Sequence, residues 1–265
     1  MKISIIGCGN MGYAYARSFR KYGLVKVEDL VLVVRNAANS AKLASLGTVA
    51  KELTSSIGES DLVIIAVKPQ DFGNVAPALA KIIRKEQVVL SIMAGITMER
   101  LQTSLDHTIV VRAMPNSPAQ IGMGITAYAT ATELNMRQTL MVEQLLNSTG
   151  RALHLADEGM LDAVTALSGS GPAYFFHIVS GMIETGIKLG LEPHVASALV
   201  KQTMLGSYHL LDHSESTPEE LIKAVTSKGG TTEAAFQVLK KEDLAGTLDR
   251  AIGAATLRAK ELSSS

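Results

Sequence analysis

The sequence predicts an α/β protein, with an N-terminal Rossmann-type doubly wound parallel sheet followed by an all-helical C-terminal domain. Two observations predict it. Short apolar runs alternate with helical segments over the first 157 residues, as expected for parallel strands that are buried on both faces. Beyond that point long helical segments follow one another with few strand signals. We therefore expect two domains, an α/β domain at 1–157 and a helical domain at 158–265.

The elements of the first half follow in regular order. A first helix is expected at 10–22, where Gly23 can end it. Apolar and β-branched runs predict strands at 2–6, 30–34, 61–67, 87–93, 108–113 and 125–130. Because helical stretches separate most of these strands, a mostly parallel sheet follows.

The second half reads as helices. Residues 163–183 carry no formal charge over a length that could cross a membrane, but Pro172 and several glycines favour a buried helix with a broken start. Thr217, Pro218 and Glu220 form a capping-box signature. Further helices are expected at 194–213, 231–239 and 243–262, and the last three serines are expected to form a tail.

Composition excludes several classes of function. The 25 Lys and Arg balance 25 Asp and Glu, so the chain lacks the basic excess that nucleic-acid binding or an anionic membrane surface needs. One cysteine permits no internal disulfide and suits a reducing compartment, so a cytoplasmic protein is expected. His209 and His213 are one turn apart without a third ligand, so no metal site is expected.

A glycine-rich motif follows the first strand. Residues 7–12 read Gly-Cys-Gly-Asn-Met-Gly, a GxGxxG pattern between a strand and a helix. Gly7 permits the tight turn, Gly9 lets the backbone approach a pyrophosphate, and Gly12 lets the helix pack closely. Asn10 and Met11 begin the helix, whose free N–H groups would hold the phosphates. An ordinary glycine-rich turn is the alternative.

The end of the second strand favours NADPH. An NAD-preferring site usually has an acidic residue there, whereas this chain has Arg35 and Asn36 and no acid before Glu52. Arg35 can pair with a 2′-phosphate and stack on adenine, and Asn36 can donate a hydrogen bond. If Arg35 is only a solvated loop residue, NADH is also accepted.

Two later strands end in residues suited to the same cofactor. Val67, Lys68 and Pro69 follow one strand, and Ala94 and Gly95 follow the next. Ligands bind at the carboxyl ends of strands in open α/β sheets, and small residues admit the nicotinamide ribose. Routine strand exits remain the alternative.

Several segments together resemble the pyrroline-5-carboxylate reductase family. They are Val-Arg-Ala-Met-Pro-Asn-Ser-Pro at 111–118, which contains Asn116, Leu-Ser-Gly-Ser-Gly-Pro-Ala-Tyr at 167–174, and Gly-Gly-Thr-Thr at 229–232. The resemblance implies hydride transfer from NAD(P)H to 1-pyrroline-5-carboxylate, giving L-proline. It also implies that residues 1–157 are the dinucleotide-binding domain and residues 158–265 a helical dimerisation and substrate-binding domain. The protein would be a dimer or a pentamer of dimers, with an active site between a nucleotide domain and helices contributed by the dimer.

The Gly-Gly-Thr-Thr segment is the candidate substrate site. Gly229, Gly230, Thr231 and Thr232 immediately precede or begin a predicted helix, and Ser227 lies just before them. Free N–H groups and hydroxyls there would cradle the substrate carboxylate, although a simple N-cap would have the same pattern. The resemblance implies that the Thr232 hydroxyl lies near the substrate nitrogen, which makes Thr232 the candidate catalytic residue.

One residue departs from the family pattern. Lys228 stands where the family more often has proline. The lysine either helps to bind the anion or points to solvent, and the loss of proline frees the backbone of the loop.

Two rival functions are less consistent with the sequence. A β-hydroxyacid dehydrogenase would need a lysine four residues after Gly171, where this chain has Phe175, and Val179 replaces its polar partner. A non-catalytic NADP-binding sensor would bind NADPH without consuming it. Apolar residues at 182, 183, 187, 189 and 191 predict an oligomer interface, with a monomer core as the alternative.

Overall fold

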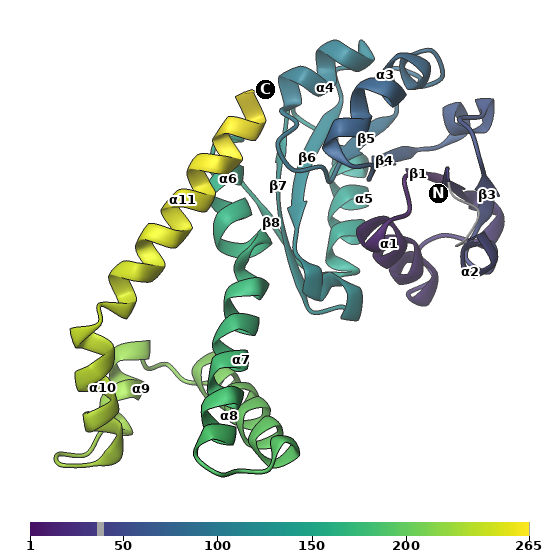
Figure 1. The fold of residues 1–265 in the computed structure, drawn as a ribbon. Coiled ribbons are helices and arrows are strands. Elements are labelled where there is room, and N and C mark those ends of the chain that lie inside the picture. The colour runs from purple at the N-terminus through teal and green to yellow at the C-terminus, as the bar shows by residue number, and fades with distance from the viewer. Residues whose placement is uncertain (36–39, 265) are drawn as a thin grey trace. The chain divides into compact units, whose positions relative to one another are not determined.

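The computed structural model describes residues 1–35 and 40–264. The chain divides into two compact units, Met1–Pro172 with Ala254–Ser265, and Ala173–Gly253. The first unit holds the sheet and its covering helices, and the second is helical (Figure 1). The expected boundary at 157/158 precedes the compact-unit boundary, because the first turns of the helical half still belong to the first unit.

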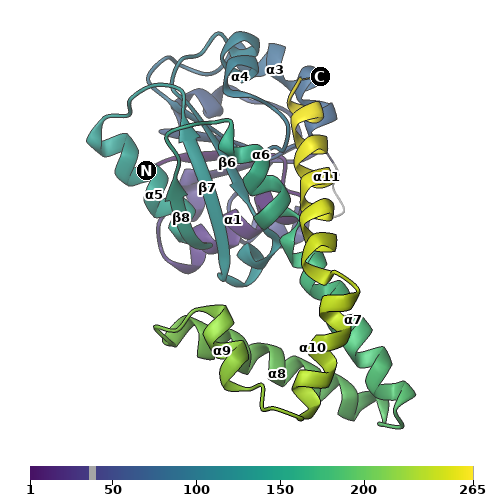
Figure 2. The same cartoon turned by 90° about the vertical axis from the view of Figure 1, so that its left-hand side faces the viewer.

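The described residues of the first unit form one eight-stranded sheet in the order β3-β2-β1-β4-β5-β6-β7-β8. All neighbours are parallel except β6 and β7, and β8 forms an edge beyond β7 (Figure 2). The strands are β1 (Ile3–Ile6), β2 (Leu30–Val33), β3 (Thr48–Ala50), β4 (Leu62–Ile65), β5 (Val88–Ser91), β6 (Val110–Pro115), β7 (Gly124–Thr130) and β8 (Gly150–His154).

The doubly wound parallel sheet is confirmed, with two strands that the sequence analysis did not place. β3 has only three residues and β8 is half exposed at the other edge, so neither has the continuous apolar run of the central strands. In contrast, β1, β4 and β5 are buried at every position. The central strands could therefore be predicted from the sequence, whereas the edge strands could not.

Helices cover both faces of the sheet. The α-helices of the described residues are α1 (Asn10–Lys21), α2 (Ser40–Ala44), α3 (Phe72–Ala80), α4 (Met98–Leu105), α5 (Met136–Asn147), α6 (Met160–Val164), α7 (Gly171–Lys188), α8 (Pro193–His213), α9 (Pro218–Ala224), α10 (Thr231–Lys241) and α11 (Leu244–Ser264). One face buries Tyr15 and Phe19 of α1 and Leu145 of α5 against the strands. The other buries Phe72 of α3 and Leu101 of α4.

Several helix ends match their sequence signals. The capping box of α9 is present, with the Thr217 hydroxyl accepting from the Glu220 N–H and the Glu220 carboxylate accepting from the Thr217 N–H. A π-helical turn at 165–169 precedes α7, which is the expected broken start. The expected tail is wrong at Ser263, which lies inside α11 and donates to Asp162 at 3.1 Å.

The expectation that α7 is buried is wrong for the single chain. Of its residues only Gly171 is buried, while Phe175 and Phe176 are 59% and 66% exposed. No helix among the described residues combines the length and apolarity needed to cross a bilayer. The apolar composition of α7 is therefore not explained by packing within the single chain.

Candidate functional site

A cavity of about 780 Å³ opens where β1, β2, β3 and β4 end. Gly7, Gly9, Arg35, Val67 and Lys68, all of them predicted cofactor residues, line it. The strand order reverses between β1 and β4, so the cavity lies at the topological switch point where open α/β sheets bind nucleotides.

The glycine loop has the geometry of a phosphate cradle. Gly7 has a φ of +93°, and its N–H donates to Val33 at 2.9 Å. A Cβ at Gly12 would stand 2.2 Å from the Gly7 carbonyl oxygen, whereas a Cβ at Gly9 would meet nothing within 4 Å. The open space at Gly9 faces a helix start that has no acidic residue in its first turn. Both features fit a bound pyrophosphate.

The neighbouring loop residues have different places. Asn10 lines a smaller cavity of about 210 Å³ beside Gly9, and Met11 packs against the core. Cys8 is only 9% exposed, and burial raises the pKa of its thiol to about 12. Cys8 therefore stays a neutral thiol at physiological pH, which suits a packing role rather than a nucleophile.

At the end of β2, Arg35 is 74% exposed and its Nη2 lies 2.6 Å from the Asp71 Oδ2. Asp71 ends the 3₁₀ turn Pro69–Asp71 that follows β4, and Asp71 and Glu52 both line the cavity. Asp71 was not among the predicted cofactor residues, although it lies two residues beyond Pro69. Asn36, the other residue predicted to select NADPH, lies outside the described residues.

Three predicted cofactor residues follow β5 and β6, away from the cavity lining. Gly95 has a φ of +71°, and a Cβ there would stand 2.9 Å from the Leu262 Cβ, within the same unit. Ala94 beside it is partly buried. Asn116 is engaged on both sides, because its Oδ1 accepts from the Ile125 N–H at 3.0 Å and its Nδ2 donates to Ser168 at 3.3 Å.

The Gly-Gly-Thr-Thr segment lies in the second unit, at the start of α10. Gly229 has a φ of +74°, which favours glycine, and a Cβ at Gly230 would stand 2.6 Å from the Ser227 hydroxyl and 3.0 Å from its carbonyl oxygen, so a larger residue at Gly230 would require Ser227 to shift. The Gly229 N–H donates to Glu233 at 2.7 Å, and the Gly230 N–H donates to Ser227 at 3.0 Å. These two donors are already used, which leaves the first N–H groups of α10 and the threonine hydroxyls for a ligand.

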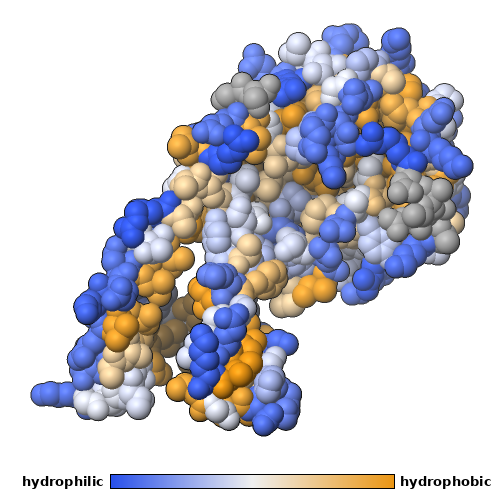
Figure 3. Space-filling view, in the orientation of Figure 1, coloured by the Kyte–Doolittle hydropathy of each residue, from blue (hydrophilic) through white to orange (hydrophobic). Residues whose placement is uncertain are grey.

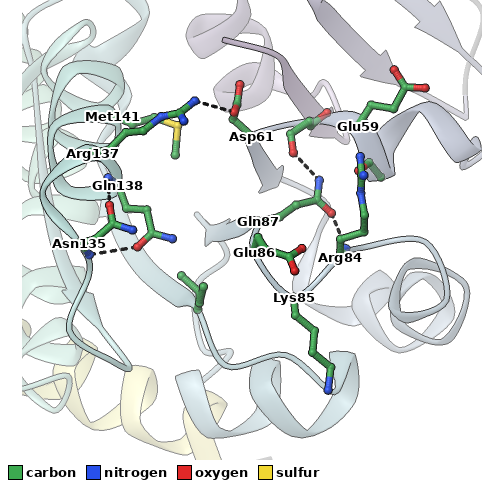
Figure 4. Close-up of a pocket in the computed structure, with 13 residues that line it drawn as sticks. Glu59, Asp61, Arg84, Lys85, Glu86, Gln87, Asn135, Arg137, Gln138 and Met141 are labelled. Atoms are coloured by element: carbon green, nitrogen blue, oxygen red, sulfur yellow. Dashed lines mark hydrogen bonds and ion pairs between the residues drawn. The ribbon is translucent and has the colours of Figure 1, made fainter.

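A second large cavity, of about 820 Å³, lies at the amino ends of β4, β5 and β6 (Figure 4). Two of its side chains have partners in the cavity wall: Arg137 contacts Asp61 at 3.1 Å, and the Gln87 amide donates to the Ser60 carbonyl at 2.6 Å. This cavity therefore lies at the opposite end of the strands from the glycine loop, which follows the carboxyl end of β1. Among the described residues no group of three or more His, Cys, Asp or Glu is arranged to hold a metal ion.

Comparisons with known proteins match both halves of the chain. A family model described as NADP oxidoreductase coenzyme F420-dependent matches residues 2–95, and one described as Pyrroline-5-carboxylate reductase dimerisation matches residues 158–262. The pyrroline-5-carboxylate reductase of Pseudomonas aeruginosa is 38% identical over 98% of this chain and 96% of its own. The Aquifex aeolicus protein of the same name is 35% identical over 99% and 97%.

Solved structures agree with this match. A Streptococcus pyogenes 1-pyrroline-5-carboxylate reductase has a TM-score of 0.87 at 31% identity and covers 98% of both chains. A Plasmodium falciparum pyrroline carboxylate reductase with NADP bound has a TM-score of 0.90 at 26% identity, covering 99% of this chain and 98% of its own. The curated relatives and the solved structures align with nearly the whole of this chain. It therefore belongs to the pyrroline-5-carboxylate reductases.

Proposed function

We propose that this protein reduces 1-pyrroline-5-carboxylate to L-proline with NADPH as the reductant. The observation that carries the proposal is the match to curated reductases over 98% of the chain, which spans both the glycine loop and the Gly-Gly-Thr-Thr segment. A β-hydroxyacid dehydrogenase is the alternative, but this chain has Phe175 at the position where that enzyme needs a lysine.

The cofactor would be held by the cavity at the glycine loop. Gly9 and the first N–H groups of α1, with Asn10 and Met11, would bind the pyrophosphate. Arg35 and Asn36 would bind the 2′-phosphate, and Val67, Lys68 and Pro69 the neighbouring ribose. Ala94, Gly95 and Asn116, at the next strand exits, would border the nicotinamide. Bound there, NADPH supplies a hydride for the carbon of the C=N bond.

The substrate carboxylate would be held by the start of α10. Ser227 and the segment 229–232 present N–H groups and hydroxyls at a positive helix end, which suits an anion. Lys228 is exposed in this loop and adds a positive charge. Because Glu233 occupies the Gly229 N–H, the Thr231 and Thr232 hydroxyls and the N–H groups of the first turn carry the recognition.

Thr232 would orient the ring. A protonated imine carbon is already electrophilic, so positioning supplies much of the rate and no strong acid or base is needed. The Thr232 hydroxyl would hydrogen-bond the substrate nitrogen and relay to it, from solvent, the proton that the imine takes up on reduction. The residue is partly buried, which would limit competition from water.

The test is the loss of NADPH absorbance with racemic 1-pyrroline-5-carboxylate. We expect Thr232→Ala to lower kcat about 50-fold, the effect of one hydrogen bond made mainly in the transition state, while Thr232→Ser stays within about fivefold. The Kd for NADPH should be unchanged in both variants. Wild-type protein that binds NADPH tightly and shows no turnover would contradict the proposal and favour a sensor.

The assembly follows from the same family. The dimerisation domain supports a homo-oligomer, and we propose that the protein is a dimer or a pentamer of dimers in the cytoplasm. Light scattering coupled to size-exclusion chromatography distinguishes a dimer from a decamer. We also keep the functional boundary at 157/158, because the dimerisation model begins at residue 158.

A further inference from the structure

The cofactor cavity contains a carboxylate in direct contact with the residue that selects NADPH. The Arg35 Nη2 and the Asp71 Oδ2 are 2.6 Å apart, close enough for a charge-assisted hydrogen bond. The Asp71 side chain is 23% exposed and Arg35 is 74% exposed, so the carboxylate is the better-fixed partner. Both residues line the same cavity.

The two residues reach this point from different strands. Arg35 follows β2 and Asp71 follows β4, and both strands pair with β1 in the sheet. An acidic residue that binds the ribose hydroxyls of NAD usually ends the second strand. This chain has Arg35 there, but the fold brings a carboxylate to the same place from the turn after β4.

The chemistry of the pair affects the two cofactors in opposite ways. A 2′-phosphate must compete with Asp71 for the Arg35 guanidinium, and it is repelled by the carboxylate at close range. A 2′-hydroxyl can instead donate to the Asp71 carboxylate, and Arg35 neutralises the charge of that carboxylate without hindrance.

We propose that Asp71 is a specificity-determining residue that weakens NADPH binding and gives NADH a partner, so that the enzyme accepts both cofactors. This inference rests on the proposed binding of the adenosine end of NADP(H) in the cavity. It makes the acceptance of NADH a property of one identified side chain.

The proposal can be tested by binding alone. Calorimetric titration of the full-length protein would give Kd values for NADPH and NADH, and for 2′,5′-ADP and 5′-AMP, which carry no nicotinamide. The variants are Asp71→Asn, Arg35→Met and a matched control, Glu52→Gln. Glu52 lines the same cavity, so Glu52→Gln removes one negative charge from it as Asp71→Asn does.

Asp71→Asn should fold normally, because the Asp71 side chain makes no capping hydrogen bond to α3. We expect it to lower the Kd for NADPH and 2′,5′-ADP about fivefold and to raise that for NADH and 5′-AMP about threefold, as for close charges near a surface. Glu52→Gln should change each value less than twofold. Arg35→Met should weaken NADPH and 2′,5′-ADP about tenfold and leave NADH nearly unchanged.

The outcomes separate the two ideas. If Arg35→Met weakens NADPH but Asp71→Asn shifts all ligands by the same factor, the role of Asp71 is overturned and the site stands. Weaker NADPH binding by Asp71→Asn would also overturn it, because Asp71 would then hold Arg35 in place for the phosphate. If Arg35→Met leaves all four Kd values unchanged, the 2′-phosphate site itself is wrong.

Discussion

Two glycines of one loop are required for different reasons. A Cβ at Gly12 would stand 2.2 Å from the Gly7 carbonyl oxygen, so Gly12 is needed for folding. A Cβ at Gly9 would meet nothing within 4 Å, and the φ of Gly9 is −67°, which any residue adopts. Gly9 is therefore needed only when a ligand occupies the space in front of it.

We predict that Gly9→Ala keeps its thermal midpoint within about 2 °C of the wild type and weakens NADPH binding at least about 30-fold, because its methyl group enters the pyrophosphate space. Gly12→Ala should lower the midpoint by about 10 °C or fail to fold, because its clash is with backbone. Differential scanning fluorimetry with and without NADPH measures both effects. Normal NADPH affinity in Gly9→Ala would place the pyrophosphate elsewhere.

Cys8 allows a prediction about pH. Burial raises the pKa of its thiol to about 12, and only the thiolate reacts with iodoacetamide. The native protein at pH 8 should therefore be alkylated at least about 100-fold more slowly than the unfolded protein, with a rate that rises about tenfold per pH unit. Mass spectrometry of quenched samples follows the reaction. Equal rates for the native and unfolded protein would show an accessible, ordinary thiol.

At the scale of elements, a buried ion cluster ties four segments of the first unit together. Arg112 of β6 is 5% exposed, and it contacts Glu158 at 2.8 Å and Asp162 of α6 at 3.5 Å. Glu158 also accepts from the Met98 N–H at the start of α4, and Ser263 of α11 donates to Asp162. If Arg112 were removed, the carboxylates of Glu158 and Asp162 would stay largely shielded from solvent and would have no opposite charge beside them.

We predict that Arg112→Met lowers the free energy of unfolding by about 3 kcal/mol, as when one partner of a buried pair is removed. The matched control is Arg137→Met. The Arg137 side chain, which pairs with Asp61, is 84% exposed, and that of Asp61 is 34% exposed. That variant should cost less than about 1 kcal/mol. Urea titration followed by circular dichroism gives both free energies of unfolding. Similar decreases in the two variants would show that the buried cluster around Arg112 contributes no more than an exposed ion pair.

The elements also show what the sequence could predict and why. The central strands and the glycine loop were predictable because strands buried on both faces are continuously apolar and because the loop is local in sequence. β3 and β8 were missed because edge strands lack that pattern. Asp71 was missed because its contact with Arg35 joins residues 36 positions apart through the sheet order, which no local pattern encodes.

At the scale of the whole molecule, the helical half leaves apolar side chains uncovered in the single chain. Figure 3 shows hydrophobic side chains on the surface of its helices, and Met182, Ile187 and Leu189 are 49%, 40% and 80% exposed. The apolar pattern of the sequence predicts an oligomer interface there, and the dimerisation family model covers all three residues. Exposed apolar area of this kind is typical of an obligate interface.

A charge placed on this surface should therefore separate the subunits. We predict that Met182→Glu raises the dissociation constant of the dimer at least about 100-fold, because the carboxylate would be buried without a partner. Met136→Glu is the matched control: Met136 lies in α5 of the first unit and is 81% exposed, so the same substitution should leave assembly unchanged.

Sedimentation velocity across a dilution series measures the dimer equilibrium in both variants. NADPH titration of the same samples separates dissociation from unfolding, because the glycine-loop cavity belongs to the first unit and should still bind the cofactor. A monomeric Met182→Glu protein that binds NADPH but does not reduce the imine would show that turnover needs the assembled helices. An unchanged dimer in Met182→Glu would instead mean that α7 is not the interface, and that its apolar side chains have some other partner.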